Sequence, residues 1–408
     1  MNRIFRLKNP VKHYDWGSPQ WIPQLLGAAN PEGFPWAELW MGVHPEGPSL
    51  VECEGTALPL SLLIAQDPAL YIGTAVEQAF GTLPFLFKLL AVEKPLSIQA
   101  HPNKEQAQKG WERENQLRIP FKAPYRNYKD PYHKPEIICA LSPFKALCGF
   151  QEPEQIAQGL TEFAQSAPES LQRALNTLTQ TLQTRDTAQS LWAFLQGLFA
   201  LPPALGQALS AYGRDHKERL IHEYPAYKEA WQLIAYFAEL YPGDPGVIAP
   251  LYLNRIALEP GEGLYLPAGV LHAYIRGFGV ELMANSDNVL RGGLSSKHVD
   301  SQELVRILDF SVFHPQILKA QPSGYQIPTK EFSLWVREGQ GDQVQYPPSL
   351  PGILIVTQGK LHITFAGGEA EWDLSQGESA FIPAGRPEDL RFSGTYTLYG
   401  AGMGYEAV

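Results

Sequence analysis

The sequence predicts a mainly β protein that is interrupted by one helical insertion. Its 408 residues include 36 glycines and 35 prolines, which separate many short apolar runs, and 11% of the chain is aromatic. This pattern is typical of short strands joined by tight turns. In the middle of the chain the apolar residues change to helical spacing. Alternation returns in residues 359–365, which indicates a second strand-rich segment after the helices.

The helical insertion is predicted from residues 154–239. Pro153 precedes this segment and the Pro- and Gly-rich residues 241–246 follow it. We therefore expect a helical insertion domain at residues 151–243, with the aromatic stretch 224–241 in its core and no motif that indicates its role. Strand patterns resume at Gly246, and residues 300–303 resemble a capping box that starts one more helix. The helical spacing is clearest at Ile156, Leu160, Phe163, Leu171, Leu175, Leu178 and Leu182.

A short internal repeat indicates two related β-structures. Residues 261–269 (GEGLYLPAG) correspond to residues 377–385 (GESAFIPAG). Each copy has a turn, a short strand and a second turn, which is half of the motif found in cupin barrels, a form of double-sheet jelly roll. We therefore expect two cupin-type jelly-roll barrels plus an α-helical domain. Residues 1–150 and 244–310 would form the first barrel, and residues 311–408 would form the second.

Composition disfavours several classes of partner. Lys and Arg total 32 against 42 for Asp and Glu, which gives a net charge of −10, so generic binding to nucleic acid or to anionic membranes is not expected. We find no apolar run that predicts a signal peptide or a membrane-spanning helix. Cys53, Cys139 and Cys148 form no Cys-x-x-Cys motif, which favours buried thiols in a cytoplasmic protein. We expect a monomer or a weak homo-oligomer.

Three separated fragments supply potential ligands for one metal ion. In a strand over residues 97–101, Gln99 and His101 would share one face. Glu136 heads the apolar run 137–141, and His272 follows a Pro-Ala-Gly turn. Two imidazoles, one carboxylate and one amide suit zinc or a similar divalent ion. A lone histidine would more often be a satisfied polar group inside a barrel, but a bare charge at such inward positions is costly unless it is paired or coordinated.

The second copy of the repeat does not offer the same ligands. The position that corresponds to His272 is occupied by Glu388, and no Gln-x-His sequence precedes the C-terminal copy. We therefore expect the first barrel to be the catalytic one and the C-terminal barrel to lack metal ligands.

A second polar cluster follows His272 in the sequence. Residues 285–288 are rich in turn formers and predict a loop, and Arg291 comes before two glycines. Its planar guanidinium suits a phosphate or an enediolate, although a surface Arg291 paired with Asp287 is the simpler alternative. Lys134 and Lys297 are equally ambiguous. We find neither a nucleotide-binding motif nor a Gly-x-Ser-x-Gly nucleophile motif in the chain.

Residues 128–136 and 272–297 resemble the two signature stretches of type I mannose-6-phosphate isomerases. Residues 37–42, 93–104 and 286–288 agree as well, and the resemblance extends over roughly residues 1–150 and 245–300. It implies one Zn²⁺ per chain, held by Gln99, His101, Glu136 and His272. The chain departs from the family pattern at Tyr132, at Gly292 and at Ser295-Ser296, which affects the expected loop stiffness and phosphate contact.

The resemblance also implies an activity and roles for other residues. The reaction would interconvert mannose 6-phosphate and fructose 6-phosphate through a cis-enediol or enediolate, by moving a proton between C1 and C2. The phosphorylated hexose would be bound by Ser97 and Lys297. The catalytic residues would be Arg291 together with Lys134, Glu281 and Asp287.

Several alternatives remain open at the level of sequence. The proton-transferring base could be Lys134, Glu281 or Asp287, because that choice needs distances to the sugar carbon. Zinc could polarise the substrate or only anchor the site, since four protein ligands leave less open coordination than the usual three of a catalytic zinc. The competing functions are a non-enzymatic bicupin that binds a metal or a sugar, and a cupin isomerase for a different phosphosugar.

Overall fold

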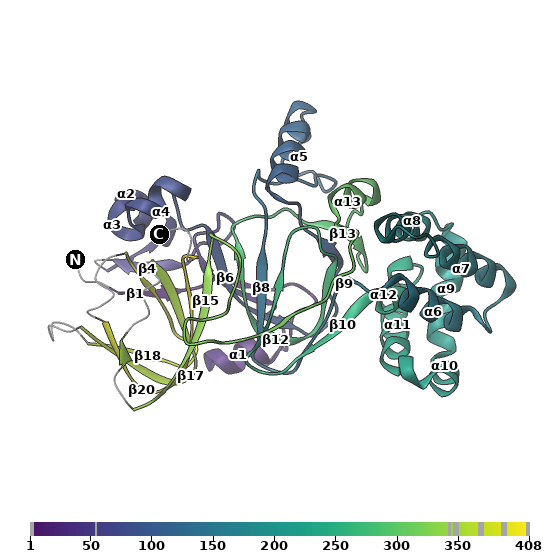
Figure 1. Ribbon diagram of the computed structural model, residues 1–408. Helices are drawn as coiled ribbons and strands as arrows, with labels where there is room; N and C mark the ends of the chain where they lie inside the picture. The colour runs from purple at the N-terminus through teal and green to yellow at the C-terminus, as the bar shows by residue number, and fades with distance from the viewer. Residues whose placement is uncertain are drawn as a thin grey trace.

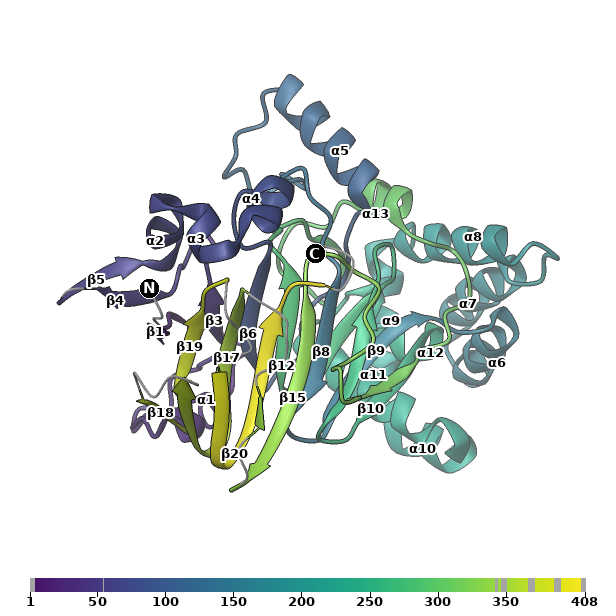
Figure 2. The same ribbon diagram turned by 60° about the vertical axis from the view of Figure 1, so that its left-hand side comes forward.

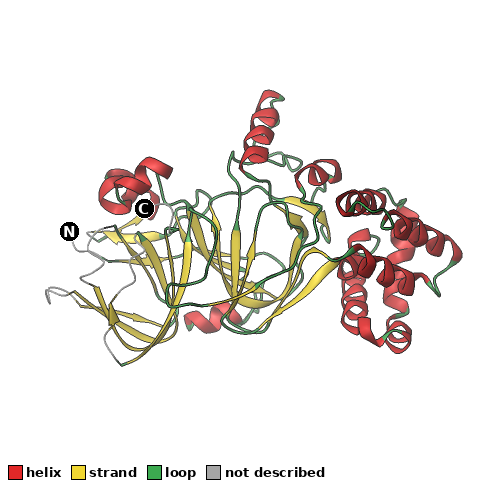
Figure 3. Ribbon diagram, in the orientation of Figure 1, coloured by secondary structure: helices red, strands yellow, loops and turns green. Residues whose placement is uncertain are grey.

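The computed structural model describes residues 4–53, 55–341, 344–345, 351–365, 371–384 and 390–404. These residues form two antiparallel sheets and several groups of helices (Figures 1 and 3). The mainly β fold with a helical insertion is therefore confirmed, whereas the sheets are not closed barrels. None of the described helices is both long enough and apolar enough to cross a membrane.

The first sheet carries the predicted metal ligands. Its central strand is β12 (His272–Ala284), which pairs with β6 on one side and β8 on the other. The beginning of β12 also pairs with β7 and β9. The order along the sheet is β14 (Ile317–Lys319), β11 (Glu262–Leu266), β8 (Glu136–Ala140), β12, β6 (Phe85–Val92), β3 (Glu38–Gly42) and β2 (Val11–Lys12), with β7 (Ile98–Ala100), β9 (Phe144–Phe150), β10 (Leu253–Leu258) and β13 (Leu290–Gly293) attached beside it.

The second sheet combines the two ends of the chain. The N-terminal strand β1 pairs with β19, with Phe5 opposite Phe381, so residues far apart in sequence lie side by side (Figure 2). The order is β15 (Ser333–Gln340), β20 (Leu390–Gly402), β17 (Gly352–Phe365), β19 (Ser379–Ile382), β1 (Phe5–Lys8), β4 (Leu50–Cys53) and β5 (Thr56–Pro59), with β16 (Val344–Gln345) and β18 (Glu371–Ser375) attached.

A shared hydrophobic core joins the two sheets. Phe85 and Phe87 of β6 pack in one buried cluster with Ile353 and Ile355 of β17. The thiol of Cys139, on β8, adds a polar contact at 2.9 Å from the hydroxyl of Tyr325. Because side chains alternate along each strand, the other face of β8 and β12 is left to form the site.

The predicted helical insertion is confirmed as helix. The helices form a separate group at the right of Figure 1, and the predicted apolar series, such as Leu171, Leu175 and Leu178, is buried. They are α6 (Pro153–Ala164), α7 (Glu169–Thr181), α8 (Thr187–Phe199), α9 (Pro203–Asp215), α10 (Lys217–Glu223), η1 (Pro225–Tyr227) and α11 (Lys228–Leu240).

The prediction that a strand begins at Gly246 is wrong for the first residues of that segment. Two short helices, η2 (Pro245–Ile248) and α12 (Ala249–Tyr252), precede strand β10. Pro245 and Pro250 stand at the starts of these helices, where a missing amide is tolerated. The run from Val247 to Leu253 is buried throughout, so its hydrophobicity alone does not distinguish a helix from a strand.

Helices outside the insertion were mostly missed from the sequence. Helix α13 (Ser301–Ile307) was expected, and Asp300 caps it by accepting from the amide of Glu303 at 2.9 Å. The second hydrogen bond of a capping box would run from the amide of Asp300 to the side chain of Glu303. The Glu303 carboxylate accepts from Tyr128 and Arg113 instead. The missed helices are α1 (Trp21–Leu26), α2 (Leu60–Gln66), α3 (Pro68–Ile72), α4 (Thr74–Phe80) and α5 (Lys104–Gln116), the last with a capping box of Asn103 and Gln106.

The first part of the internal repeat, a turn followed by a short strand, is confirmed in the backbone. Gly261 directly before β11 and Gly377 two residues before β19 both adopt positive φ, +87° and +83°. A side chain is unfavourable in this conformation, so glycine is required in each turn. The two copies lie in different sheets. The end of the second copy, Gly385, and the position of Glu388 lie outside the described residues.

Candidate metal centre and its cavity

The strands of the first sheet bring the predicted metal ligands together. His272, at the start of β12, pairs across the sheet with Gln99 of β7. His101 follows β7 directly, and Glu136 begins β8. One ligand atom from each of His101, Glu136 and His272 lies within 4.8 Å of the others. The amide nitrogen of Gln99 lies 3.3 Å from Nε2 of His272, so all four predicted side chains converge.

Both imidazoles face the carboxylate with the same ring atom. Nε2 of His272 lies 3.0 Å from Oε1 of Glu136, and Nε2 of His101 lies 3.4 Å from Oε2. On the far side of each ring, Nδ1 lies against a backbone carbonyl. Nδ1 of His272 lies 3.0 Å from the carbonyl oxygen of Val270, and Nδ1 of His101 lies 2.7 Å from that of Asn288. These carbonyls can only accept, so Nδ1 carries the proton in both rings, and a neutral ring directs its Nε2 lone pair at Glu136.

This arrangement fits a bound cation. Oε2 of Glu136 is buried and accepts no hydrogen bond from the described residues, although Nζ of Lys134 lies 3.1 Å away. Burial, together with Lys134, lowers the pKa of His101 to about 4, which keeps this ring neutral as a ligand requires. Burial raises the pKa of Glu136, but Lys134 and His101 outweigh it and hold that pKa well below its usual value. A half turn of the Gln99 amide would present its oxygen to the same point.

A cavity of about 550 Å³ opens beside these side chains. Gln99 and Lys134 line it and also contact the histidine and glutamate ligands. The register of β13 places Arg291 directly opposite Gln99. The structure therefore brings every other predicted site residue to the same cavity, namely Ser97, Glu281, Asp287, Arg291 and Lys297.

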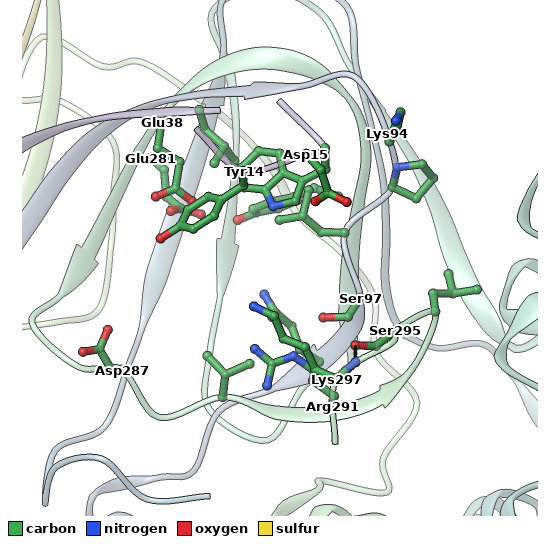
Figure 4. Close-up of a pocket in the computed structure, with 18 of the residues that line it drawn as sticks. Tyr14, Asp15, Glu38, Lys94, Ser97, Glu281, Asp287, Arg291, Ser295 and Lys297 are labelled. Carbon is green, nitrogen blue, oxygen red and sulfur yellow. Dashed lines mark hydrogen bonds between the residues drawn. The ribbon is translucent and has the colours of Figure 1, made fainter. Parts of the chain in front are cut away.

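One side of the cavity is cationic. Arg291 and Lys297 lie together there with the hydroxyls of Ser97 and Ser295 (Figure 4). Burial lowers the pKa of Arg291, and burial together with Arg291 lowers that of Lys297. Guanidinium, ammonium and hydroxyl groups are the donors that bind phosphate oxygens. We call this side, formed by Ser97, Arg291, Ser295 and Lys297, the cationic wall.

The opposite side holds a buried ion-paired triad that was not predicted. Nζ of Lys88, on β6, lies 2.9 Å from Oε2 of Glu281 and 3.7 Å from Oε2 of Glu38. Burial raises the pKa of Glu281, although Lys88 opposes the shift. Figure 4 shows Glu281 and Glu38 across the cavity from Arg291. A signal was present in the sequence, because a charge inside an apolar strand such as β6 is costly unless it is paired.

Asp287 lies apart from both of these groups (Figure 4). Oδ2 of Asp287 lies 3.3 Å from Nε2 of the buried His44. Nδ1 of His44 accepts from the amide of Glu46 at 3.3 Å, so Nε2 carries the proton and donates to Asp287. Burial raises the pKa of Asp287, but the hydrogen bond from His44 and the charges of Lys134 and Lys88 together outweigh it, so the pKa is lowered. Asp287 thus pairs with His44 and not with Arg291, the partner in the simpler alternative. No periodic pattern in the sequence marked His44.

The predicted loop at residues 285–288 is present and is fixed in place by Asn288. The side-chain amide of this buried residue donates to the carbonyl oxygens of Asp130 and Tyr132, both at 2.8 Å. Its own backbone carbonyl is the group that holds the ring of His101. One residue therefore connects the His101 ring to the segment that carries Lys134 and Glu136.

Comparison with known proteins agrees with this site. The model of the catalytic domain of type I phosphomannose isomerase matches residues 4–153. The chain is 37% identical over 388 residues to mannose-6-phosphate isomerase of Escherichia coli K12, which covers 93% of this chain and 94% of that protein. The chain belongs to the type I phosphomannose isomerase family. The resemblance inferred from residues 128–136 and 272–297 is thereby confirmed.

Other members of the phosphomannose isomerase family show how widely the similarity extends. Human mannose-6-phosphate isomerase is 32% identical over 418 residues, covering 96% of each chain. A zinc-bound crystal structure of mannose 6-phosphate isomerase superimposes with a TM-score of 0.86 at 34% identity, covering 98% of this chain and 99% of that one. The similarity therefore includes the helical insertion and the second sheet as well as the metal centre.

Proposed function

We propose that this chain is a zinc-dependent aldose-ketose isomerase that interconverts mannose 6-phosphate and fructose 6-phosphate. The observation that carries the proposal is the convergence of His101, Glu136 and His272 beside a cavity with a cationic wall. Relatives named mannose-6-phosphate isomerase cover nearly the whole chain, and one is a zinc-bound structure. A metal centre and an anion site in one cavity favour this reaction over a non-enzymatic binding protein.

Gln99, His101, Glu136 and His272 would hold one Zn²⁺. Oε2 of Glu136, which accepts no hydrogen bond from the described residues, and the two converging Nε2 atoms support this assignment. When bound, zinc supplies positive charge that stabilises oxyanions of the sugar. The carbonyls of Asn288 and Val270 fix the two rings in the orientation that ligation needs.

The cationic wall would bind the phosphate of the substrate and stabilise the negative charge that develops on the sugar during the reaction. Lys297 and Ser97 offer an ammonium and a hydroxyl to the phosphate group. Arg291 lies opposite Gln99 on the neighbouring strand. Its guanidinium can therefore stabilise the negative charge of an enediolate at C1 and C2 of the sugar. Arg291 would thus be the catalytic arginine, and Ser97 and Lys297 would bind substrate.

Glu281 is the best supported base among the three candidates. A useful base has a pKa near the working pH, and burial raises the pKa of Glu281 whereas that of Asp287 is lowered. Lys134 is a cation paired with Glu136 at 3.1 Å, which suits a proton donor to sugar oxygens. In this proposal Glu281 moves the proton between C1 and C2, and Asp287 orients the substrate or the loop.

We also propose that the two sheets correspond to two cupin-type jelly-roll units, although neither sheet is closed into a barrel. Residues 1–150 with 244–310 would form the catalytic unit, residues 151–243 the helical insertion domain, and residues 311–408 the C-terminal unit without metal ligands. The repeated turns, each followed by a short strand, β11 or β19, support this layout, while β1, β4 and β5 cross into the second sheet and β14 into the first. The thiols of Cys139 and Cys148 are free, which supports a cytoplasmic location. We propose a monomer or a weak homo-oligomer, to be checked by light scattering.

A coupled assay with mannose 6-phosphate tests the proposed function directly. We expect turnover in the zinc-loaded protein, loss of turnover after chelation and recovery when zinc is returned. Binding of the sugar phosphate without turnover would instead support the non-enzymatic bicupin. Turnover of a different phosphosugar, with none of mannose 6-phosphate, would support the other isomerase.

A further inference from the structure

The helical segment reaches the cavity through its last residues. Helix α11 ends at Leu240, and both Leu240 and Tyr241 line the cavity. The hydroxyl of Tyr241 donates to the carbonyl oxygen of Pro95 at 3.2 Å, which joins the end of the helices to the segment that leads into β7. The aromatic stretch was expected to form only helical core, and Trp231 and Phe237 are indeed fully buried. Tyr241 has a second surface, which faces the cavity.

Asp244 connects this segment to the loop that carries the cationic wall. Its partly buried carboxylate accepts a hydrogen bond from the backbone amide of Gly246 at 2.7 Å. The backbone amides of Leu294 and Ser295, from the loop after β13, lie close enough to lower the pKa of this carboxyl. Burial outweighs the three amides, so the pKa of Asp244 is raised. One carboxylate thereby interacts with backbone amides of two segments that are far apart in sequence.

The loop has a backbone conformation that needs such an anchor. Gly293 has a φ of +133° and Leu294 has a φ of +51°, in the left-handed region that a leucine rarely adopts. A Cβ on Gly293 would lie 2.9 Å from Oδ1 of Asp244 and 3.2 Å from the Cα of Gly246. The loop is therefore packed against Asp244, and the carboxylate lies where it can stabilise this backbone conformation through the nearby amides.

The anchored loop delivers the donors of the cationic wall. Arg291 precedes Gly293, while Ser295 and Lys297 follow it, and all three line the cavity (Figure 4). The hydroxyl of Ser295 accepts from the amide of Lys297 at 3.0 Å, so fixing Ser295 also fixes the start of Lys297. We propose that Asp244 is a positioning residue for the cationic wall, through which the helical segment sets the affinity for the substrate's phosphate. The identity of the sugar rests on the proposed function, whereas the affinity for a phosphate anion does not.

The test compares D244A with a matched aspartate variant, D186A. Asp186 lies within the helical insertion, which ends just before Asp244, and caps α8 by accepting from the amide of Gln189 at 3.1 Å, far from the loop in sequence. In D244A we expect KM for mannose 6-phosphate to rise on the order of tenfold, because the charge-assisted contacts that hold the loop are lost. We expect kcat to change by less than about threefold, because Arg291 stays paired in β13 opposite Gln99 and the residues that move are those after Gly293, which bind the phosphate. D186A should change neither value.

A second readout measures affinity without catalysis. Titration calorimetry with inorganic phosphate on the zinc-loaded protein should show a dissociation constant that rises in D244A by about the same factor as KM, with zinc content unchanged. If D244A does not fold, D244N and G293A test the inference through the same two quantities, the KM for mannose 6-phosphate and the dissociation constant for inorganic phosphate. D244N keeps one acceptor oxygen, and G293A pushes a methyl group against the carboxylate from the loop side.

The inference is overturned by any of three results. Folded Asp244 variants could retain the wild-type KM and phosphate affinity, D186A could show the same losses, or inorganic phosphate could fail to bind the wild type at millimolar concentration. Failure of the proposed function looks different. In that case the wild type would bind phosphate, the Asp244 variants would weaken that binding, and mannose 6-phosphate would not be turned over by any of them.

Discussion

Replacement of Lys88 by methionine tests the buried triad beside the cavity. Nζ of Lys88 lies 2.9 Å from Glu281, and the two side chains are 8% and 6% exposed, so water screens this pair little. At an effective dielectric constant of about 20, unit charges at that distance attract by about 6 kcal/mol. Desolvation offsets much of this attraction. Removing one partner nevertheless leaves Glu281 and Glu38 buried without a cation, which costs about 3–5 kcal/mol.

The pH of the stability measurement follows from the pKa of Lys88. Burial lowers that pKa, but Glu281 and Glu38 more than offset the effect, so the folded-state pKa is raised. A raised lysine pKa contributes stability that is fully present below the unfolded value, about 10.5, and is lost only as pH rises through the folded pKa. Urea unfolding at pH 7, followed by tryptophan fluorescence, should therefore show the whole loss in K88M. K88R should lose much less because it keeps the cation.

The same variant also tests Glu281 as the base. Lys88 opposes the raised pKa of Glu281, so K88M should raise that pKa further. Activity is lost when the base is protonated, so the acid limb of the kcat/KM profile should move to higher pH in K88M and return in K88R. A K88M protein with wild-type stability and an unshifted acid limb would refute the reasoning about the triad.

Three further predictions concern the other candidate residues. E281Q should lower kcat by about 10²- to 10⁴-fold, the usual contribution of a positioned base, and a larger loss in D287N than in E281Q would transfer that role to Asp287. H44F removes the hydrogen-bond donor to Asp287, so the pKa of Asp287 should rise toward its ordinary value in a carboxyl NMR titration. In H44Q the glutamine can keep a donor, so the pKa should rise less. The same Asp287 pKa in both variants would contradict the assigned hydrogen bond. R291A should lower kcat while zinc affinity stays within about twofold, since Arg291 lies beside the ligands without being one; near-normal turnover would remove it from the mechanism.

The metal centre could be predicted from sequence because its residues obey local rules. A period of two along residues 97–101 relates Gln99 to His101, and a turn places His272 at the start of β12. Glu136 stood out as a charge opening an apolar strand. Each of these signals requires only neighbouring residues and a strand, so the strand assignments were enough to identify candidate ligands, and the family resemblance implied that they hold one ion.

The rest of the cavity depends on contacts that no local pattern specifies. Lys88 is explained only by the pairing of β6 with β12, which sets it opposite Glu281. His44 is explained only by a loop more than 200 residues later, and Asp244 by the loop after β13. Such residues become recognisable once the sheet register is known, because their partners come from strands or loops distant along the chain.

The secondary structure differed from expectation where propensity was weak or ambiguous. Helices α2, α3 and α4 are each five to seven residues long, too short for the apolar period to repeat. The run after Gly246 is buried throughout and so shows no period. The prediction of closed barrels was wrong. A similarity of nine residues predicts a turn and a strand, but it does not predict whether the strands at the two edges of a sheet pair with each other.

The most direct test of the metal centre is the zinc content of the purified, zinc-equilibrated protein, measured by mass spectrometry after removal of free metal. The proposal predicts one zinc ion per chain in the wild type and far less than one in E136Q, which keeps the shape of the glutamate but not its charge. Wild-type protein without stoichiometric zinc, or an E136Q protein that retains one ion per chain, would contradict it.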